Sequence, residues 1–395
     1  MSQAANVFEK LELNGLKALD AFRKRAFTPD SKPTLRTWGI NDASLMIGRS
    51  RKTIFDLEKE NKIPPAEIDS SSGRRFYTLK HINSLRTYFG TKPCRPSSSD
   101  PAVIAVTNFK GGVWKTTTAI NAAQFFALKG YRVLFVDADS QGSGTQCFGY
   151  IPDNDIGDNN TLLPFLLGES LNLSSVIRQT FWDGLDLIPA NLALYNAEFE
   201  LPVKNTRLQE EGKSFCFYDI LRQGIESIKE NYDIIIIDCP PSMGMISINS
   251  IYAATALLIP IPPSMLDFSS TVQFFGMLKD ILTRLPQKEY SFLRLLITKK
   301  ENSEKTKELV AAIRQLYGTY VQLAMMPNSE AIKKIGMDML SIYEVEKYAG
   351  NKKTLDRIRQ AADEVNLELE DLIKKYWYDS SLIENPNNME TAKND

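Results

Sequence analysis

The stretch NFKGGVWKTTTAIN, Asn108–Asn121, decides the fold. It follows the phosphate-binding pattern G-x-x-x-x-G-K-[ST], but Phe109 stands at the first glycine position and Trp114 at the second. An apolar run from Val103 to Thr107 precedes it, and a helical pattern opens at Lys115. A strand, a tight loop and a helix N-terminus in this order hold phosphate groups in many proteins. The sequence therefore predicts a nucleotide site here.

The two bulky residues do not exclude this site. Phosphate is held by backbone N–H groups, a lysine ammonium and a hydroxyl on magnesium, so position 114 has to supply only its N–H. We expect tryptophan to be tolerated there if its φ angle stays negative and its indole points away from the phosphates, while two glycines allow close backbone approach. The residues expected to bind ATP or ADP from this pattern are Gly111, Gly112, Val113, Trp114, Lys115, Thr116 and Thr117.

Three aspartates follow apolar runs farther along the chain. RVLFVDADSQG carries Asp137 and Asp139, and YDIIIIDCPPS carries Asp238. The carboxyl ends of parallel strands meet at one edge of a sheet, so these groups are expected to converge on the phosphate loop. Asp238 has the position of an acid that holds Mg²⁺ through water beside the Thr116 hydroxyl. Asp139 is expected to orient the attacking water. Each alone would be interpreted as a strand-end or helix-capping aspartate, and only their combination favours a hydrolase.

The fold class follows from the runs that surround the loop. Apolar segments alternate with helical patterns, as a parallel sheet covered on both faces requires. We therefore expect an α/β, doubly wound, mostly parallel sheet over residues 102–378. A long amphipathic helix is expected from Asn351 to Trp377, and the polar residues 379–395 are expected to form a disordered tail. The strand candidates are AVIAVTN, RVLFVDAD, LDLIPA, YDIIIIDCPP, ALLIPIPPS and FLRLLITKK.

The first hundred residues differ in charge from the rest. They hold 18 Lys and Arg against 11 Asp and Glu, whereas the remaining chain holds 29 against 37. A basic end is typical of nucleic-acid contact, although solvated surface charge explains it as well. The Pro- and Ser-rich segment 93–101 is expected to be a linker, with an N-terminal arm over residues 1–35 and a basic domain over 36–92.

Residues 36–92 contain a helix-turn-helix pattern. Apolar residues precede a turn at Gly48, and Ser50 is placed to cap a second helix. The segment DSSSGRRFYT resembles the wing of MerR-type regulators, and a small helical interaction domain is the alternative. The residues expected to contact DNA here are Arg49, Arg51, Lys52, Thr53, Arg74 and Arg75.

Several segments together resemble one family. KGGVWKTT, VDADSQG (with Ser140 in place of the family's proline), IIIIDCPPS and PIPPSMLDFSSTVQFFGMLKDI are similar to the deviant phosphate loop and following motifs of the ParA/MinD superfamily of P-loop NTPases. Within it they look most like the plasmid-partition ParA proteins with an N-terminal helix-turn-helix. The resemblance runs from about residue 35 to residue 375.

The resemblance implies a weak ATPase that closes as a homodimer around two nucleotides, in which Lys110 reaches the phosphates of the other subunit. A ParB-type partner would stimulate hydrolysis. It also implies that Lys334, with Lys333 beside it, holds non-specific nucleoid DNA, and that the N-terminal domain binds the protein's own operator. We expect a cytoplasmic, nucleoid-associated protein with no membrane contact, because no apolar run approaches the length of a membrane span.

Two other functions share parts of this pattern. A transcriptional regulator whose α/β domain only senses nucleotide would need the DNA-binding domain, but it has less need of Asp139. An electron-transfer protein of the nitrogenase iron-protein type would need cysteines that bind a cluster. The four cysteines, Cys94, Cys147, Cys216 and Cys239, contain no C-x-x-C pair, so a disulfide framework and a zinc site are not expected either.

Overall fold

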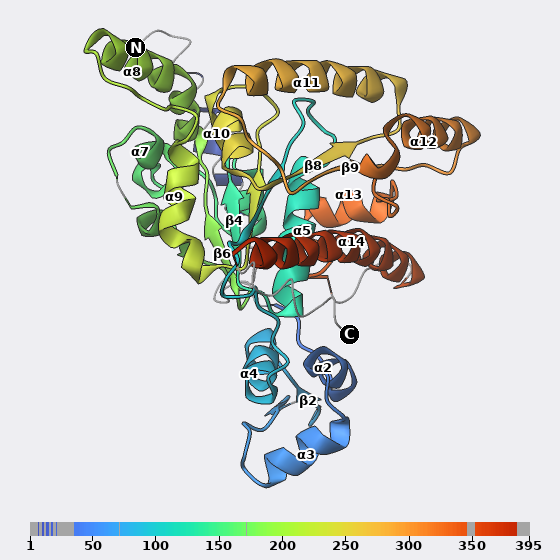
Figure 1. Cartoon of the computed structure of the whole chain (residues 1–395). Coiled ribbons are helices and arrows are strands. Elements are labelled where there is room, and N and C mark those ends of the chain that lie inside the picture. The colour runs from blue at the N-terminus through green and yellow to red at the C-terminus, as the bar shows by residue number, and fades with distance from the viewer. Residues whose placement is uncertain are drawn as a thin grey trace, which may run out of the picture.

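The computed structural model describes residues 35–70, 72–170, 172–345 and 352–384, with isolated positions between 7 and 21. Its largest part is a seven-stranded sheet in the order β5-β6-β4-β7-β3-β8-β9 (Figure 1). All neighbouring strands are parallel except β5 and β6. The α/β class and the six expected strands are confirmed. The strands are β3 (Ala102–Val106), β4 (Val133–Asp137), β5 (Arg178–Gln179), β6 (Leu185–Ile188), β7 (Ile234–Asp238), β8 (Ala256–Ile261) and β9 (Phe292–Ile297).

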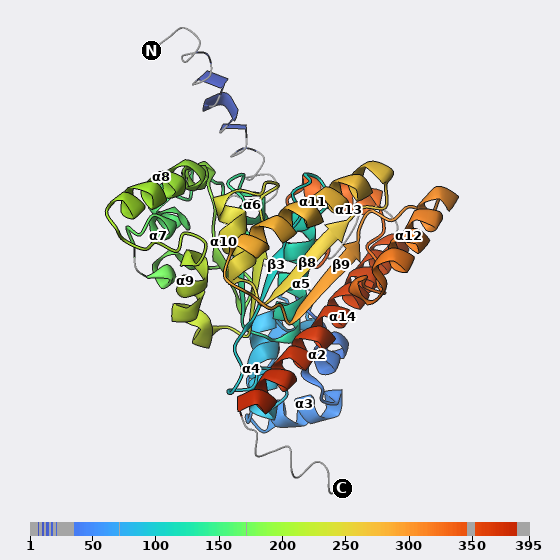
Figure 2. The same ribbon diagram turned by 45° about the horizontal axis from the view of Figure 1, so that its top comes forward.

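The strands are apolar throughout because both faces of the sheet are covered. In β7, Ile234 and Ile236 belong to one buried cluster, whereas Ile235 and Ile237 belong to another. Successive side chains of a strand point to opposite faces, so a continuous apolar run fills two cores at once. Figure 2 shows the sheet between α11 on one side and α14 on the other.

The helices divide between these two cores. α5, α13 and α14 contribute to the first, and α7 to α12 contribute to the second. Their bounds are α5 (Lys115–Lys129), α6 (Ser143–Cys147), α7 (Leu163–Leu166), α8 (Ala197–Glu210), α9 (Ile220–Ile228), α10 (Met245–Ala253), α11 (Met265–Arg284), α12 (Glu304–Tyr317), α13 (Glu330–Met337) and α14 (Lys352–Glu384). Five 3₁₀ turns join them, at Asp158–Asn160, Leu173–Val176, Leu192–Asn196, Lys229–Asn231 and Gly318–Tyr320.

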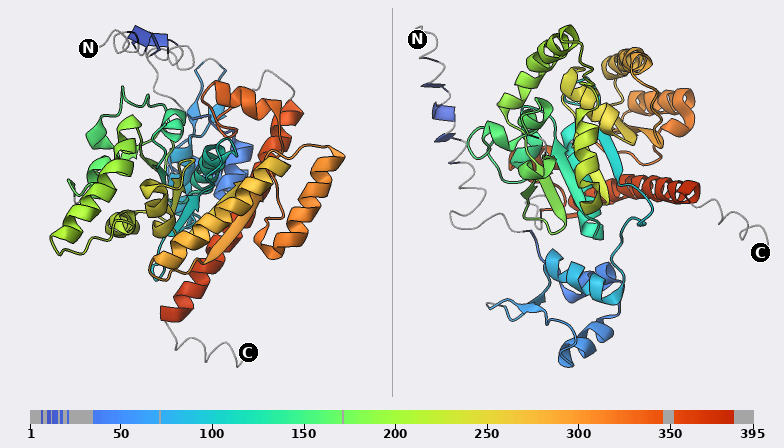
Figure 3. Two further views of the ribbon diagram at one scale, coloured as in Figure 1. Left: turned by 90° about the horizontal axis from the view of Figure 1, so that it is seen from above. Right: turned by 60° about the vertical axis from the view of Figure 1, so that its left-hand side comes forward.

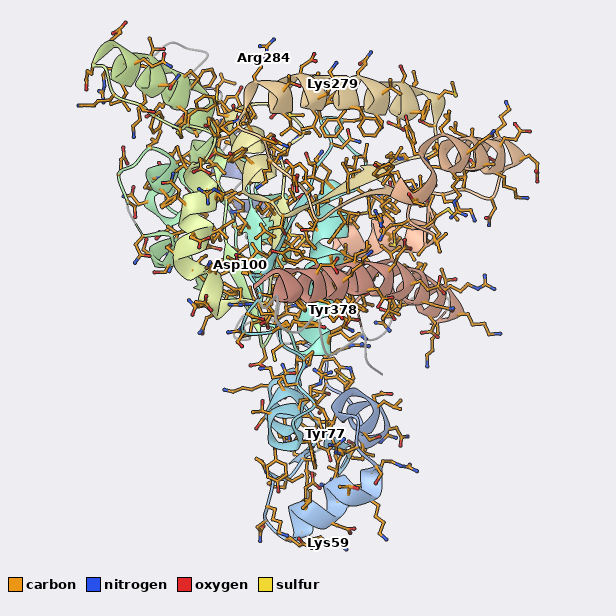
Figure 4. The ribbon with its side chains drawn as sticks, viewed as in Figure 1. Lys59, Tyr77, Asp100, Lys279, Arg284 and Tyr378 are labelled. Atoms are coloured by element: carbon orange, nitrogen blue, oxygen red, sulfur yellow. The ribbon has the colours of Figure 1, made fainter. Side chains whose placement is uncertain are left out.

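The N-terminal unit lies at the end of the molecule opposite α11 (Figure 1). It consists of α2 (Ile40–Ile47), α3 (Arg51–Lys59), the antiparallel hairpin β1 (Glu67–Ile68) and β2 (Arg75–Phe76), and α4 (Leu79–Phe89). The hairpin projects from this unit in the right-hand view of Figure 3. Tyr77 is fully buried in its interior (Figure 4) and forms an isolated antiparallel bridge with Trp38. Both residues belong to the buried cluster that α5, α13 and α14 share, so this apolar core continues from the large unit into the N-terminal unit.

The segment expected to be a linker is fixed to the large unit. Arg95 is buried and donates to the carbonyl of Tyr232 and to the carboxylate of Glu230, and Ser99 Oγ donates to the carbonyl of Trp377 at 2.9 Å. The segment joins α4 to β3, and the buried Arg95 supplies enough hydrogen bonds to fix it against the large unit.

The C-terminal helix is longer than expected. α14 continues to Glu384, so the residues directly after Asp379 are helical where we expected the start of a tail. The rest of that tail and nearly all of the expected arm, residues 1–35, fall outside the described residues. Among the helices of the described part, none combines the length and the hydropathy that a bilayer span requires.

Candidate nucleotide-binding site

The phosphate loop links the end of β3 to the first turn of α5. Asn108 shapes it from within: its side-chain amide donates to the Pro260 carbonyl at 3.0 Å, and its Oδ1 accepts from the Lys110 N–H at 3.0 Å. Val113 is buried, and its carbonyl accepts from the Thr298 hydroxyl at 3.0 Å. The loop is thus held from β8 and from the residue that follows β9.

Trp114 adopts a conformation that we did not expect. Its φ and ψ angles are +71° and +35°, in the left-handed region. A non-glycine residue there costs about 1–2 kcal/mol, which explains the glycine of the usual pattern. The expectation that the φ angle of Trp114 stays negative is therefore wrong. The indole packs against the core on the α5 face, and Lys299 Nζ lies 5.7 Å from the ring centroid. These contacts offset the backbone strain.

Lys115 opens α5 and points back over the loop. It is buried, and its Nζ donates to the Lys110 carbonyl at 3.0 Å. Burial lowers the pKa of this ammonium group, and the nearby carboxylates of Asp238 and Asp139 raise it in part. A cation with so little solvent around it interacts strongly with any anion that enters. Lys115 is therefore placed to bind a phosphate group.

A cavity of about 460 Å³ opens beside the loop. Its volume lies within the usual range of ligand pockets. The structure brings most of the predicted nucleotide residues to it, including both threonines of the first turn and Asp139. Val113 is not part of its wall. The wall is formed by Gly111, Gly112, Trp114–Thr117, Ile120, Asn121, Asp139, Ser143, Gln146, Cys147, Pro241, Ile332, Ile335, Gly336 and Met339–Ile342.

Two buried aspartates lie opposite each other on neighbouring strands. Asp137 of β4 pairs in register with Asp238 of β7. Asp137 accepts from the N–H and the hydroxyl of Thr145, both at 2.7 Å, and burial raises its pKa to about 7. Burial and the Asp137 charge also raise the pKa of Asp238 well above its usual range. The sequence indicated that these groups converge, and the sheet register brings them together.

Asp238 has the geometry of a cation-binding group. Both its carboxylate oxygens are buried, and neither has a hydrogen-bond partner within the described part of the chain. The Thr116 hydroxyl lies near enough to lower its pKa slightly, without forming a hydrogen bond. Mg²⁺ in nucleotide sites takes one or two protein oxygens and fills its other positions with phosphate and water. Thr116 and Asp238 therefore fit this ion. Nowhere in the described residues do three His, Cys, Asp or Glu side chains gather around a metal position.

Asp139 lies just beyond β4 on the rim of the cavity. Its Oδ1 accepts from the Gln141 N–H at 3.0 Å, and burial raises its pKa while Lys115 lowers it. One carboxylate oxygen has no protein donor in the described part of the chain.

The other wall of the cavity comes from α13 and the residues after it, which we had not connected with the nucleotide.

The signal for α13 was present in EAIKKIG. Its apolar residues Ile332 and Ile335 are buried and line the cavity, whereas Lys333 and Lys334 are exposed on the same helix. We had considered only its lysines. Lys333 pairs with Glu330 at 2.7 Å, and no ion pair of Lys334 occurs among the described residues.

The N-terminal unit places the expected DNA-contacting residues on two elements. α2 ends at Gly48, which has a left-handed φ of +74°, and Ser50 caps α3 by accepting from the Thr53 N–H at 3.1 Å. Arg51 and Lys52 are exposed in the first turn of α3. Helices α2 and α3, the hairpin and α4 thus occur in the order that a winged helix-turn-helix has.

Some of these arginines have partners within the protein. Arg49 donates to the carbonyls of Gly48 and Phe89, and Arg75 binds Glu58 and lies 4.8 Å over the Phe55 ring. Arg51 donates to Asn41 at 2.9 Å. Of the expected residues, Lys52 and Arg74 make no such contact in the described part.

Known proteins resemble this chain over most of its length. A family model described as an AAA domain matches residues 101–292. SopA of Escherichia coli strain K12 is 36% identical over 325 residues, which cover 80% of this chain and 83% of SopA. The chromosome partitioning protein ParA of Caulobacter vibrioides is 30% identical and covers 67% of this chain and 95% of its own. The chain belongs to the ParA-like plasmid-partition ATPases.

Solved structures agree with this ParA-like assignment. A structure named Partition Protein superposes with a TM-score of 0.67 over 95% of this chain and 99% of its own, at 19% identity, which shows the fold. ParA-like proteins are P-loop ATPases, which makes the cavity beside the phosphate loop the candidate nucleotide site of this chain. The strained Trp114 is where this member departs from the glycine of the common loop.

Proposed function

We propose that this protein uses ATP hydrolysis to partition a low-copy replicon. ATP and Mg²⁺ would close two copies around a pair of nucleotides, and the closed dimer would bind nucleoid DNA without regard to sequence. A ParB-type partner on the replicon would then stimulate hydrolysis and release the dimer. The similarity to a protein named for chromosome partitioning, ParA of Caulobacter vibrioides, supports this proposal.

One observation carries the proposal: the buried Asp238 carboxylate has no hydrogen-bond partner among the described residues and lies beside Thr116. A buried carboxylate without a partner costs several kcal/mol unless a cation or protons compensate it. A bound Mg²⁺ would remove this cost and would supply charge neutralisation for the transferred phosphoryl group. A synthase from Mycobacterium smegmatis that is 27% identical, with a TM-score of 0.50 over 58% of this chain and 88% of its own, has been solved with a bound ATP analogue and magnesium.

The other residues have separate tasks in this proposal. Lys115 binds the β- and γ-phosphates of its own subunit, and the loop N–H groups support them. Lys110, which is half-exposed and does not line the cavity, contributes its charge to the nucleotide of the second subunit. Asp139 accepts a hydrogen bond from the attacking water and orients it. Dimer closure would thus complete each site with a second ammonium group.

DNA binding is proposed for two surfaces. Lys334 and Lys333 lie on α13, whose buried residues line the nucleotide cavity, so a change at the nucleotide could move both lysines. The first turn of α3 and the β1–β2 hairpin would bind the protein's own operator. The same N-terminal elements favour a second function, a regulator that senses nucleotide without hydrolysing it.

The test measures ATP turnover and DNA binding, both in the presence of Mg²⁺. DNA binding is measured with ADP, ATP or a non-hydrolysable analogue, on random DNA and on upstream-operator DNA. Lys115→Ala should abolish nucleotide binding because the buried cation is lost. Asp139→Ala should bind ATP normally and lose hydrolysis. Tight ATP binding by the wild type with no turnover above background, with DNA and partner present, would favour the regulator. Normal turnover in Asp139→Ala would remove the role given to that acid.

A further inference from the structure

Helix α10 begins without a capping side chain of its own. Its N-cap is Gly244, so the first N–H groups of the helix must find acceptors elsewhere. They find them on α8: Glu198 Oε2 accepts from the Met245 N–H at 2.6 Å, and Glu198 Oε1 accepts from the Ile246 N–H at 3.2 Å. A carboxylate at this end of a helix also interacts favourably with the helix dipole. The position of the α10 start therefore depends on α8.

The segment before α10 is part of the nucleotide site. It runs from Asp238, at the end of β7, to Gly244, so it is fixed at one end by the sheet and at the other by Glu198. Pro241, in the middle, lines the nucleotide cavity, and a methyl group on Gly111 would lie 4.0 Å from its Cβ. Movement of the α10 start would shift this wall while the phosphate loop and Asp238 stay in place.

Gly244 gives a second indication that this contact matters. Its φ and ψ angles are −94° and −167°, which any residue can adopt, so the backbone does not require glycine. A methyl group at position 244 would overlap the Glu198 carboxylate, so a side chain there would have to displace this cap. Glycine at position 244 thus allows Glu198 to approach the α10 start.

We propose that Glu198 is a positioning residue for ATP hydrolysis: by capping α10 it holds the segment 239–244 against the phosphate loop. The inference rests on the proposed ATPase function. Glu198 does not line the cavity, so it acts through the segment and not by touching nucleotide. Loss of the cap should therefore lower kcat and leave ATP affinity nearly unchanged, because Lys115 and the loop N–H groups remain in place.

The experiment compares full-length variants at both sides of the contact. Glu198→Ala should lower kcat by about tenfold with ATP affinity within about twofold of the wild type. Glu198→Gln keeps one carbonyl acceptor, so its kcat should lie between those of Glu198→Ala and the wild type. Gly244→Ala displaces the carboxylate and should match Glu198→Ala. The double variant should be no worse than either single one, because both changes remove the same contact. Glu200→Ala, on the exposed side of the same helix, is the matched control and should behave as the wild type.

Amide hydrogen exchange of the segment 239–250 gives a readout that does not need turnover. It should be faster in Glu198→Ala and Gly244→Ala than in the wild type and in Glu200→Ala. Faster exchange with unchanged kcat would make Glu198 a structural cap only, and unchanged exchange would overturn the inference entirely. If the wild type binds ATP without hydrolysing it, the proposed function is overturned instead. Amide hydrogen exchange of residues 239–250 would then decide by itself whether Glu198 holds the segment. Thermal melting identifies any variant that fails to fold, and Glu198→Gln preserves the test in that case.

Discussion

Trp114 combines a strained backbone with a favourable side chain. Its left-handed conformation costs about 1–2 kcal/mol relative to glycine. The indole recovers part of this by packing against the α5-side core and under Lys299. Since the loop needs only the N–H of this residue, the strain does not conflict with phosphate binding.

Substitutions at Trp114 separate these two effects. Trp114→Gly should keep ATP affinity within about threefold, because glycine adopts the left-handed conformation freely. Trp114→Val should weaken ATP binding by about tenfold or more, because a β-branched residue is strongly disfavoured there. Titration of a fluorescent ATP analogue measures both. Equal affinity of the two variants would show that the loop keeps its shape without regard to this backbone angle.

Among the elements, the sheet was predictable and its edge was not. The six runs of apolar residues became β3, β4, β6, β7, β8 and β9 because a strand covered on both faces admits almost no polar residue. β5 has only two residues, at the antiparallel edge, and leaves no pattern. The same limit applies to the site. Asp139 and Asp238 lie at or just beyond the ends of recognisable strands, whereas the α13 wall of the cavity comes from residues more than 90 positions after Asp238. The left-handed angle of Trp114 depends on packing that the sequence does not display.

Helix α13 carries part of the cavity wall and the two lysines that are proposed to bind DNA, and this proposal can be measured. Lys334→Ala should weaken binding to all DNA sequences about equally and reduce the slope of log affinity against log salt by about 1. Lys333→Ala is the matched control: this lysine already pairs with Glu330, so its effect should be smaller. Filter binding over a range of salt concentrations measures both. A loss confined to the operator would contradict the role of Lys334.

At the scale of the whole molecule, the two units are tied together by buried polar contacts. Arg95 is the main one: apart from its bonds to Tyr232 and Glu230, its guanidinium donates to the Ser99 carbonyl, and its N–H donates to Asp233 at 3.3 Å. Asn83 of α4 adds a hydrogen bond of 2.8 Å to Asp183 in the large unit. Composition indicated a linker over residues 93–101, but it does not reveal that Arg95 is buried and fixes this segment.

Arg95→Ala should therefore destabilise the fold by about 2–4 kcal/mol, since several hydrogen bonds from a buried charge are lost together. Arg222→Ala, which removes an exposed pair with Asp219, should cost less than about 1 kcal/mol. Urea unfolding of both variants measures the difference. A cost for Arg95→Ala no greater than that for Arg222→Ala would mean that the segment is held by other contacts.

Helix α5 has its two ends in different parts of the molecule. Lys115 begins it in the phosphate site, and near its other end Lys129 lies 3.5 Å from Glu370 of α14 and lines a cavity together with Trp38 and Arg86 of the N-terminal unit. Its 15 residues span about 22 Å. If α5 rotates as a rigid body by about 5° about its first turn, its far end moves by about 2 Å. A triphosphate bound beside Lys115 would thus be connected through one rigid helix to the N-terminal unit, which is proposed to bind DNA.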